Sequence, residues 1–339
     1  MGGSLYGAER LPKDKFLLLL AQLVPELKMI LGDTEFMPVP FYSEKEDFGD
    51  LDIIVKANLD VVKDAIITHF NFIPECKLAS HAHQYTTNAN VLSFVYEKKF
   101  QIDLICTVAD YETSIAYYSF NDVGNILGRF CHKLGLKFGH TGLLYPLRSD
   151  GRSVRKEIIV SKDINEILRF LGLNNSKWNS GFTTLEDIFE WVASGQYFDP
   201  AIFERGEMSV INEKRDRKRK TFSKFLDWVE ETKPKQNYVF TNSDEFRDRD
   251  KFIPGIEAFF GVDIQGQQAE FRKHMEAERQ MKEKFNGEMV MEITGLKGKE
   301  LGEFMGLFKN DISGSFDEYI MSNDVEKIKD DIRHLQMSL

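Results

Sequence analysis

Hydrophobic and polar positions follow two different periods along this chain, and the change of period divides it into two parts. Between about residues 37 and 108, short runs of β-branched and aromatic residues are separated by polar segments, which predicts strands. From about residue 183 onward, apolar residues recur every three or four positions, which predicts helices. The pattern therefore predicts an α/β (α+β) fold with a mixed sheet, followed by a mostly helical C-terminal portion.

Caps, prolines and glycines indicate where individual elements begin and end. The strands are expected at "LDIIV", "VLSFVYE" and "FQIDLICTV", and a helix over 59–70 separates the first strand from the others. An amphipathic helix is predicted over 11–31, entering at Pro12, and a helix over 161–173 with Ser161 as its N-cap. Further helices are predicted over 112–137, 183–194, 199–232, 266–285 and 298–309 and at "NDVEKIKDDIRHL".

Length and composition are those of an ordinary globular protein. The 339 residues are 42% hydrophobic and 29% charged, which suffices for two or three domains with sizeable cores. The longest apolar run, "FLLLLAQLV", is too short to span a bilayer, and no small-residue cleavage site follows it, so neither a membrane segment nor a signal peptide is expected. Cys76, Cys106 and Cys131 show no CxxC spacing, which favours a reducing, cytoplasmic compartment without structural zinc.

The stretch "DFGDLDIIV" places two aspartates at the start of a strand that is otherwise apolar. Side chains two apart in a strand share a face, so Asp50 and Asp52 lie on one side and the apolar residues between and after them on the other. Two carboxylates this close repel each other unless a cation neutralises them. Asp103, in "FQIDLI", offers a third carboxylate from a second strand. Such oxygen-rich sites suit Mg²⁺, so we predict a site for two Mg²⁺ ions, with Mn²⁺ as an alternative.

A simpler interpretation of the same residues remains open at this point. In it Asp50 and Asp52 cap a turn, and Asp103 is a charge on an edge strand.

The order of these residues resembles the nucleotidyltransferase superfamily of DNA polymerase beta. The motif of that family is a Gly-Ser turn, then Asp-x-Asp after a glycine, then a third Asp, and this chain offers Ser43, Gly49, Asp50, Asp52 and Asp103 in that order. The resemblance implies a palm domain that transfers a nucleotide from a nucleoside triphosphate. It implies that Asp50 and Asp52 hold both metal ions, that Asp103 completes the ion that activates the attacking hydroxyl, and that Ser43 binds a triphosphate oxygen.

The stretch "YYSFNDVGNILGRF" (117–130) is similar to the segment that closes over the nucleotide in X-family DNA polymerases, and residues 142–173 resemble the thumb of that family. Tyr42 and Phe120 stand where the family has glycines. An ordinary amphipathic helix is the alternative for 117–130. The resemblance implies nucleotide-binding roles for Tyr117, Tyr118, Asp122, Asn125 and Arg129. Arg148 and Arg152 are further candidates for binding the triphosphate.

Two segments of the C-terminal part point to a polynucleotide. "FNGEMVMEITGLKGKELGEFMGLFKN" is similar to the tail of CCA-adding tRNA nucleotidyltransferases, and a degraded helix-hairpin-helix or a plain helix start are the alternatives. "NEKRDRKRKTFSKFLDW" (212–228) is rich in cations that could bind phosphates, although the acidic "DEFRDRD" (244–250) could balance them on a solvated face. The net charge of −10 argues against general nucleic-acid affinity. The candidate nucleic-acid-binding residues are Arg215, Arg217, Lys218, Arg219 and Lys220.

We therefore predict a Mg²⁺-dependent nucleotidyltransferase that adds nucleoside monophosphates from triphosphates to the 3′-OH of a polynucleotide, with RNA favoured over DNA. The alternatives are an X-family-like DNA polymerase, a nucleotidyltransferase that modifies a protein or small molecule, and an inactive binding module. The expected division is an N-terminal helix (1–36), a palm (37–110), pocket helices with a thumb-like subdomain (111–180), and a helical nucleic-acid-binding domain (181–339).

Overall fold

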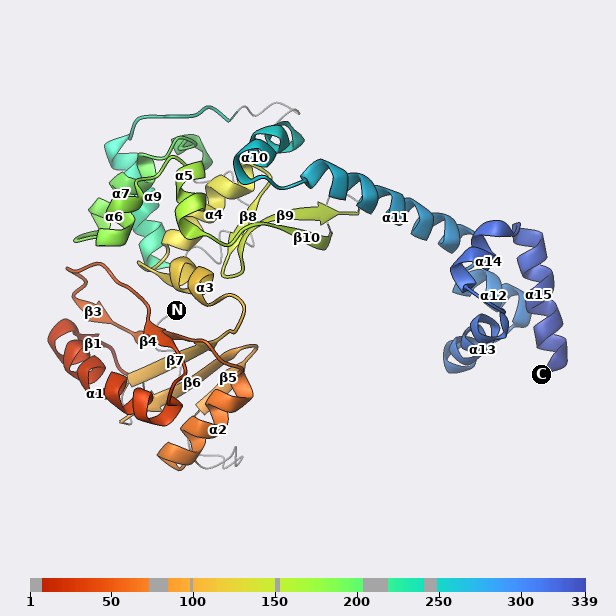
Figure 1. Cartoon of the computed structure of the whole chain (residues 1–339), viewed down its shortest axis with the longest axis horizontal. Helices are drawn as coiled ribbons and strands as arrows, with labels where there is room; N and C mark the ends of the chain where they lie inside the picture. The colour runs from red at the N-terminus through yellow and green to blue at the C-terminus, as the bar shows by residue number, and fades with distance from the viewer. Residues whose placement is uncertain (1–7, 73–84, 98–99, 150–152, 204–218, 241–248) are drawn as a thin grey trace. The chain divides into compact units, whose positions relative to one another are not determined.

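The structure is a computed structural model that describes residues 8–72, 85–97, 100–149, 153–203, 219–240 and 249–339. The chain forms two compact units, Met1–Pro146 with Glu157–Val262, and Leu147–Lys156 with Asp263–Leu339. The predicted architecture is confirmed in its coarse form, because the chain is mixed α/β with a mixed sheet and has a mostly helical C-terminal part (Figure 1).

The first unit is built on a five-stranded sheet. β4 and β7 run parallel, and every other neighbouring pair is antiparallel. The three strands expected from the sequence are confirmed as β4, β6 and β7. In sheet order the strands are β2 (Phe36–Pro38), β4 (Asp50–Val55), β7 (Phe100–Cys106), β6 (Val91–Tyr96) and β5 (Tyr85–Asn88).

One face of this sheet carries the core. α1 (Lys13–Leu31) and α2 (Leu59–Phe70) lie on that side, whereas α3 (Tyr111–Tyr118) lies on the other (Figure 1). Leu51 and Ile53 of β4 and Leu104 of β7 belong to the same buried cluster as apolar residues of both helices. The period-two alternation therefore places the aspartates on the opposite face of β4 and β7, where Ile54 and Ile105 form a smaller buried cluster with Tyr111.

Residues 112–137, predicted as one helix, instead form two helices and a strand. α3 ends at Tyr118, α4 spans Val123–Lys133, and β8 (Lys137–Gly139) follows. The break lies at Phe120 and Asn121, whose φ angles of 55° and 66° place two consecutive residues in the left-handed region. Such a pair cannot continue a right-handed helix and indicates backbone strain, which often occurs at functional sites.

A second sheet has the order β10-β9-β8, with β9 spanning Gly142–Arg148 and β10 spanning Val154–Ser161. It leads into α5 (Ile164–Phe170). The prediction that Ser161 is the N-cap of this helix is wrong. Asp163 is the N-cap, because its side chain accepts from the backbone N–H groups of Asn165 and Glu166, while Ser161 ends β10. A carboxylate two residues closer to the helix reaches those N–H groups, which the serine hydroxyl cannot.

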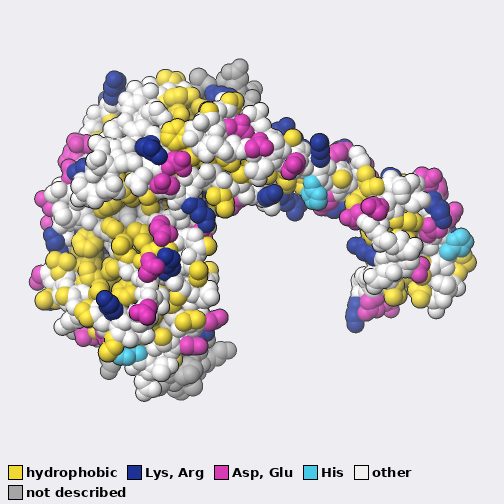
Figure 2. All heavy atoms as spheres, viewed as in Figure 1, with side chains coloured by type: hydrophobic (Ala, Val, Ile, Leu, Met, Phe, Trp, Pro, Cys, Tyr) yellow, Lys and Arg dark blue, Asp and Glu magenta, His cyan; other side chains and the backbone are white. Residues whose placement is uncertain are grey.

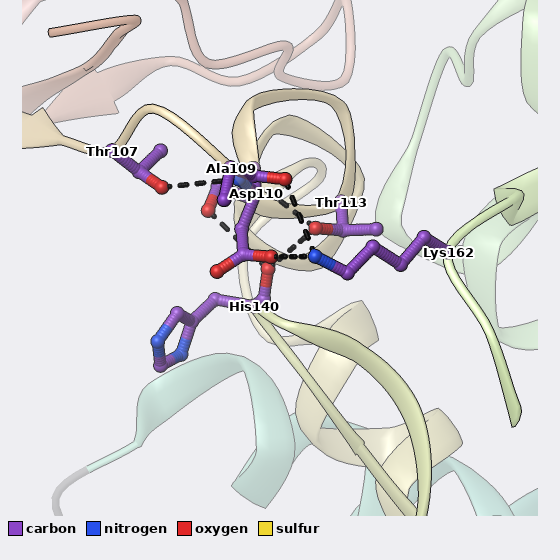
Figure 3. Close-up of polar contacts among 7 residues, drawn as sticks. Thr107, Ala109, Asp110, Thr113, His140 and Lys162 are labelled. Carbon is purple, nitrogen blue, oxygen red and sulfur yellow. Dashed lines mark hydrogen bonds and ion pairs between the residues drawn. The ribbon is translucent and has the colours of Figure 1, made fainter. Parts of the chain in front are cut away.

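A polar network ties the end of β7 to the second sheet (Figure 3). Lys162 donates to the carboxylate of Asp110 and to the carbonyl of Ala109, and the Thr113 hydroxyl lies 2.7 Å from the carbonyl of His140. Figure 3 shows the imidazole of His140 turned away from these contacts, so His140 contributes its backbone only. The network links the start of α3 to the end of β10 and to the turn before β9.

The remaining elements of the first unit are mostly short. β1 (Leu11–Pro12) pairs with β3 (Asp47–Phe48). Of the helix predicted over 199–232, the described residues form η1 (Pro200–Phe203) and α9 (Lys220–Thr232). The other helical elements are α6 (Asn175–Ser180), α7 (Leu185–Ala193), η3 (Arg249–Phe252) and α10 (Ile253–Phe260).

The second unit has its own helical core. Val290, Phe308 and Ile328 are buried in one cluster, and the ammonium of Lys284 donates to three carbonyls at the end of α14. Within the described ranges, no helix combines the length and the apolar character that crossing a membrane requires. The helices of this unit are α11 (Ile264–Lys284), α12 (Gly287–Thr294), α13 (Gly298–Asp311), α14 (Phe316–Ser322) and α15 (Val325–Ser338).

Candidate metal and nucleotide site

The strand register brings the three predicted aspartates together. Asp52 of β4 lies directly opposite Asp103 of β7, and Asp50 precedes Asp52 by two residues on the same face. One carboxylate oxygen from each of the three lies within 4.8 Å of the others. β7 lies between β4 and β6, so Asp103 is not on an edge strand. The three side chains form one cluster on the sheet face opposite the main core.

The electrostatics of this cluster show that its carboxylates repel one another. Burial, together with the charges of Asp50 and Asp103, raises the pKa of Asp52 to about 7. Burial also raises the pKa of Asp103, although hydrogen bonds from Ser93 and Gln101 act against this shift. Hard divalent cations such as Mg²⁺ prefer carboxylate oxygens, so this donor set fits the predicted ion.

Lys45 belongs to the same region, and the sequence analysis did not identify it. Its ammonium lies 3.1 Å from Asn121 Oδ1 and 4.5 Å from the ring centre of Phe48. Burial lowers the pKa of Lys45, while the charges of Asp50 and Asp52 act in the opposite direction. A cation is therefore held close to the aspartate cluster. The only signal in the sequence is a single lysine within the acidic stretch "SEKED".

The loop before β4 presents the hydroxyl of Ser43 rather than its backbone. Ser43 is exposed, but its N–H donates to the carbonyl of Phe182 at 2.8 Å, and the N–H of Glu44 donates to Thr183 at 2.8 Å. These amides cannot also hold a phosphate in this arrangement. Gly49 is buried between β3 and β4, where it joins the loop to the aspartates.

The two tyrosines at the end of α3 have different surroundings. Burial raises the pKa of Tyr118, and the charges of Tyr117 and Asp52 add to this, which places the Tyr118 hydroxyl near the aspartate cluster. The Tyr117 ring packs edge-on against Phe138, with ring centres 5.8 Å apart. Of the two, Tyr118 is the one whose environment is electrostatically linked to Asp52.

Asn125 in α4 carries an unused donor. Its Nδ2 is buried, and none of the residues in the described ranges accepts a hydrogen bond from it. A buried donor without a partner costs about 1–3 kcal/mol, so this atom is an exception within the packing of α4.

Two other predicted pocket residues contact α9. Asp122 forms an ion pair with Arg219 at 3.2 Å, and the guanidinium of Arg129 lies 5.1 Å from the ring centre of Phe222. Arg219, predicted to bind nucleic acid, is thus partly neutralised by Asp122, which was predicted to line the nucleotide pocket.

The pKa of Asp47 is lowered mainly by its hydrogen bond from Arg10, and the charge of the exposed Lys220 adds to this effect. Arg215, Arg217 and Lys218 lie outside the described residues, as do Arg152 and Cys76. Arg148 is exposed on β9 and belongs to the second compact unit, whereas the aspartates belong to the first.

The C-terminal segment that is similar to tRNA nucleotidyltransferase tails forms α12 and α13, joined by a short turn. Gly295 and Gly298 have φ angles of 72° and 56°, which glycine adopts without steric cost. Lys297 and Lys299 are exposed at the start of α13.

Comparison of the sequence with protein-family models and with curated proteins gives no match.

Proposed function

We propose that this chain is a Mg²⁺-dependent nucleotidyltransferase with a palm-like sheet. The observation that carries the proposal is the parallel register of β4 and β7, which sets Asp52 opposite Asp103 with Asp50 beside them. In the proposed reaction an acceptor hydroxyl attacks the α-phosphorus of a nucleoside triphosphate. The bond to pyrophosphate breaks, pyrophosphate leaves, and the proton of the hydroxyl passes to solvent.

The three carboxylates have distinct roles in this proposal. Asp50 and Asp52 share a strand, so they would hold both ions, while Asp103, from a second strand, would contact only the ion nearer the acceptor hydroxyl. When bound, Mg²⁺ supplies a lowered hydroxyl pKa and neutralises charge on the phosphates. The raised pKa of Asp52 supports this role, because a divalent ion would relieve the repulsion among the three carboxylates.

Lys45 and Ser43 would bind the triphosphate. Lys45 provides a cation beside Asp50 and Asp52, and Ser43 provides an exposed hydroxyl from the same loop. Tyr118 and the unused donor of Asn125 are the groups on α3 and α4 best suited to contact the nucleotide. Asp122 and Arg129, which contact α9, would act by holding that helix in place.

The proposed acceptor is the 3′-OH of a polynucleotide, and RNA is favoured. The similarity of α12 and α13 to the tails of tRNA nucleotidyltransferases and the cations of residues 212–220 support this choice. Of the described cations in that segment, Lys220 is the more exposed, since Arg219 pairs with Asp122.

An acceptor screen tests the proposal. Purified protein is incubated with Mg²⁺, each of the ribo- and deoxyribonucleoside triphosphates, and labelled tRNA, single-stranded DNA or gapped duplex DNA. We expect extension of the RNA 3′ end. Extension of gapped duplex alone would instead indicate an X-family-like DNA polymerase, and label transferred to the protein or to a small molecule would indicate another acceptor class.

A further inference from the structure

Gln101 is a buried polar residue on the same sheet face as the aspartates. Only 3% of its surface is exposed, and it lies opposite Asp50 in the register of β4 and β7. Its side-chain nitrogen Nε2 lies 2.9 Å from both Oδ1 and Oδ2 of Asp103. Burying an amide costs free energy unless it is hydrogen-bonded, and these contacts with Asp103 provide that hydrogen bonding.

Asp103 is held from a second direction as well. Ser93 of β6 lies directly opposite Asp103 and donates a hydrogen bond to it. A carboxylate has about four lone-pair positions, and these donors occupy those on the side of β6 and of the start of β7. The lone pairs that these donors leave unused are available to a cation beside Asp52, which lies opposite Asp103 on the neighbouring strand β4.

We infer that Gln101 is a positioning residue, which together with Ser93 orients the carboxylate of Asp103 so that it can bind a divalent cation shared with Asp52. This inference rests on the proposed nucleotidyl transfer. Gln101 is suited to the task because it donates without a net charge. A lysine or arginine at this position would neutralise Asp103 and compete with the cation.

The variant Gln101→Met tests this role, because methionine keeps the length and volume of the side chain and removes the donor. Two properties are compared with wild type: the affinity for Mn²⁺ of the protein without nucleotide, followed by electron paramagnetic resonance, and the separate values of kcat and KM for the triphosphate. Loss of a residue that orients a metal ligand typically lowers metal affinity or activity by about 10–100-fold. We expect a loss of this size in Mn²⁺ affinity and in kcat, with KM within about twofold of wild type.

Two further variants separate positioning from folding. Ser93→Ala removes the other donor by a small change, and we expect a smaller loss of Mn²⁺ affinity in the same direction. Asn90→Ala is the matched control, because the Asn90 side chain donates to the carbonyl of Cys106. Cys106 is the last residue of β7, at the end of the strand away from Gln101. This control should bind Mn²⁺ as wild type does.

The inference is overturned if Gln101→Met and Ser93→Ala bind Mn²⁺ and turn over as wild type does, or if Asn90→Ala loses as much Mn²⁺ affinity as Gln101→Met. The proposed function fails separately, if wild-type protein transfers no nucleotide to any acceptor. A wild-type protein that binds Mn²⁺ but transfers nothing, together with a weakened Gln101→Met, would retain the positioning role and reject the reaction.

Discussion

In the candidate site, folding disfavours the ionised form of the Asp52 carboxyl. Its pKa of about 7 in the folded protein lies above the ordinary value of about 4 that it regains on unfolding. A carboxyl whose pKa is raised by folding makes the metal-free protein less stable as pH rises from about 4 to about 7, because the unfolded state ionises first. Above that range the loss is complete and amounts to a few kcal/mol, on the order of 1.4 kcal/mol per pKa unit.

Replacing Asp52 with asparagine should remove this cost. In metal-free protein, we expect Asp52→Asn to raise the unfolding temperature relative to wild type at about pH 8, with a difference that shrinks as pH falls towards about 4. Added Mg²⁺ should stabilise wild type and leave the variant nearly unchanged. Thermal unfolding followed by circular dichroism measures both effects. A difference between the two proteins that does not vary with pH would contradict the account of Asp52.

Lys45 should matter for triphosphate binding more than for chemistry. A hydrogen bond to a charged group is worth about 1.5–3 kcal/mol, so Lys45→Met should raise KM for the triphosphate about tenfold or more, with a smaller effect on kcat. Steady-state kinetics with the triphosphate varied give both constants. Lys56→Met is the control, because Lys56 lies beyond the other end of β4 and pairs with Glu35. If both variants raised KM equally, the effect would reflect general charge and not a specific contact.

Individual residues of the site differ in how far the sequence could predict them. That Asp50 and Asp52 share a face was predictable, because period-two alternation fixes which side chains share a face of a strand. That Asp103 would lie beside them was expected only from the family resemblance, because it depends on the pairing of β4 with β7. Lys45 was not predictable, since its position depends on a contact with Asn121, which lies 76 residues away. The role of Gln101 depends on its strand being central and on the side chain across it, which a local pattern does not encode.

At the scale of elements, the break between α3 and α4 is the feature that shapes the region beside the aspartates. It allows α4 to approach α3 closely at Gly124, where a Cβ atom would lie 2.2 Å from the carbonyl oxygen of Tyr117. The backbone fixes the positions of both the added Cβ and the carbonyl oxygen, so neither atom can move without shifting a helix. Periodicity predicted a single helix over 112–137 because the apolar spacing continues through the break, and the left-handed pair Phe120–Asn121 lacks the glycine that usually marks such a turn.

Gly124→Ala should therefore destabilise the protein, whereas alanine normally favours a helix. We expect a loss of about 1–3 kcal/mol in the free energy of unfolding, as for other overpacked sites. Gly128→Ala is the matched control in the same helix, because the nearest atom to its added Cβ is 3.8 Å away. There we expect a gain of up to about 1 kcal/mol from helix propensity. Urea unfolding measures both, and equal effects at the two glycines would contradict the close packing of α3 and α4.

At the scale of the whole molecule, charge sets the conditions for binding a polynucleotide. The chain has a net charge of −10, and acidic and basic side chains are interspersed on the face drawn in Figure 2. An acidic protein of this kind needs a local concentration of cations to bind phosphates, and residues 212–220 provide one in the sequence.

Replacing Arg217, Lys218 and Lys220 with serine should weaken RNA binding. The slope of log affinity against log salt should fall by about 0.7 for each phosphate contact that is lost on a single strand. Arg219 is left in place, because it pairs with Asp122 and its loss would also disturb α4. The control replaces Lys15, Lys28 and Lys63 of α1 and α2 with serine, which changes the net charge equally. Unchanged affinity and slope in the first variant would make the segment a solvated face.

The architecture as a whole was predictable to the level of class and element type. The sequence indicated a strand-rich part followed by helices, because burial on one face of a sheet and one stripe of a helix imposes different periods. It did not indicate that β7 would lie between β4 and β6, nor that residues 157–262 would join the compact unit of the sheet. Both depend on contacts between segments far apart in the chain.

The central claim is that Asp50, Asp52 and Asp103 bind Mg²⁺ for nucleotidyl transfer, and one measurement tests it most directly. The transfer of nucleoside monophosphate from a triphosphate labelled at its α-phosphate is followed for wild type and for Asp52→Asn, with Mg²⁺ and an RNA acceptor. The account predicts incorporation by wild type and none by a variant that circular dichroism shows to be folded. Incorporation by folded Asp52→Asn at the wild-type rate would contradict it.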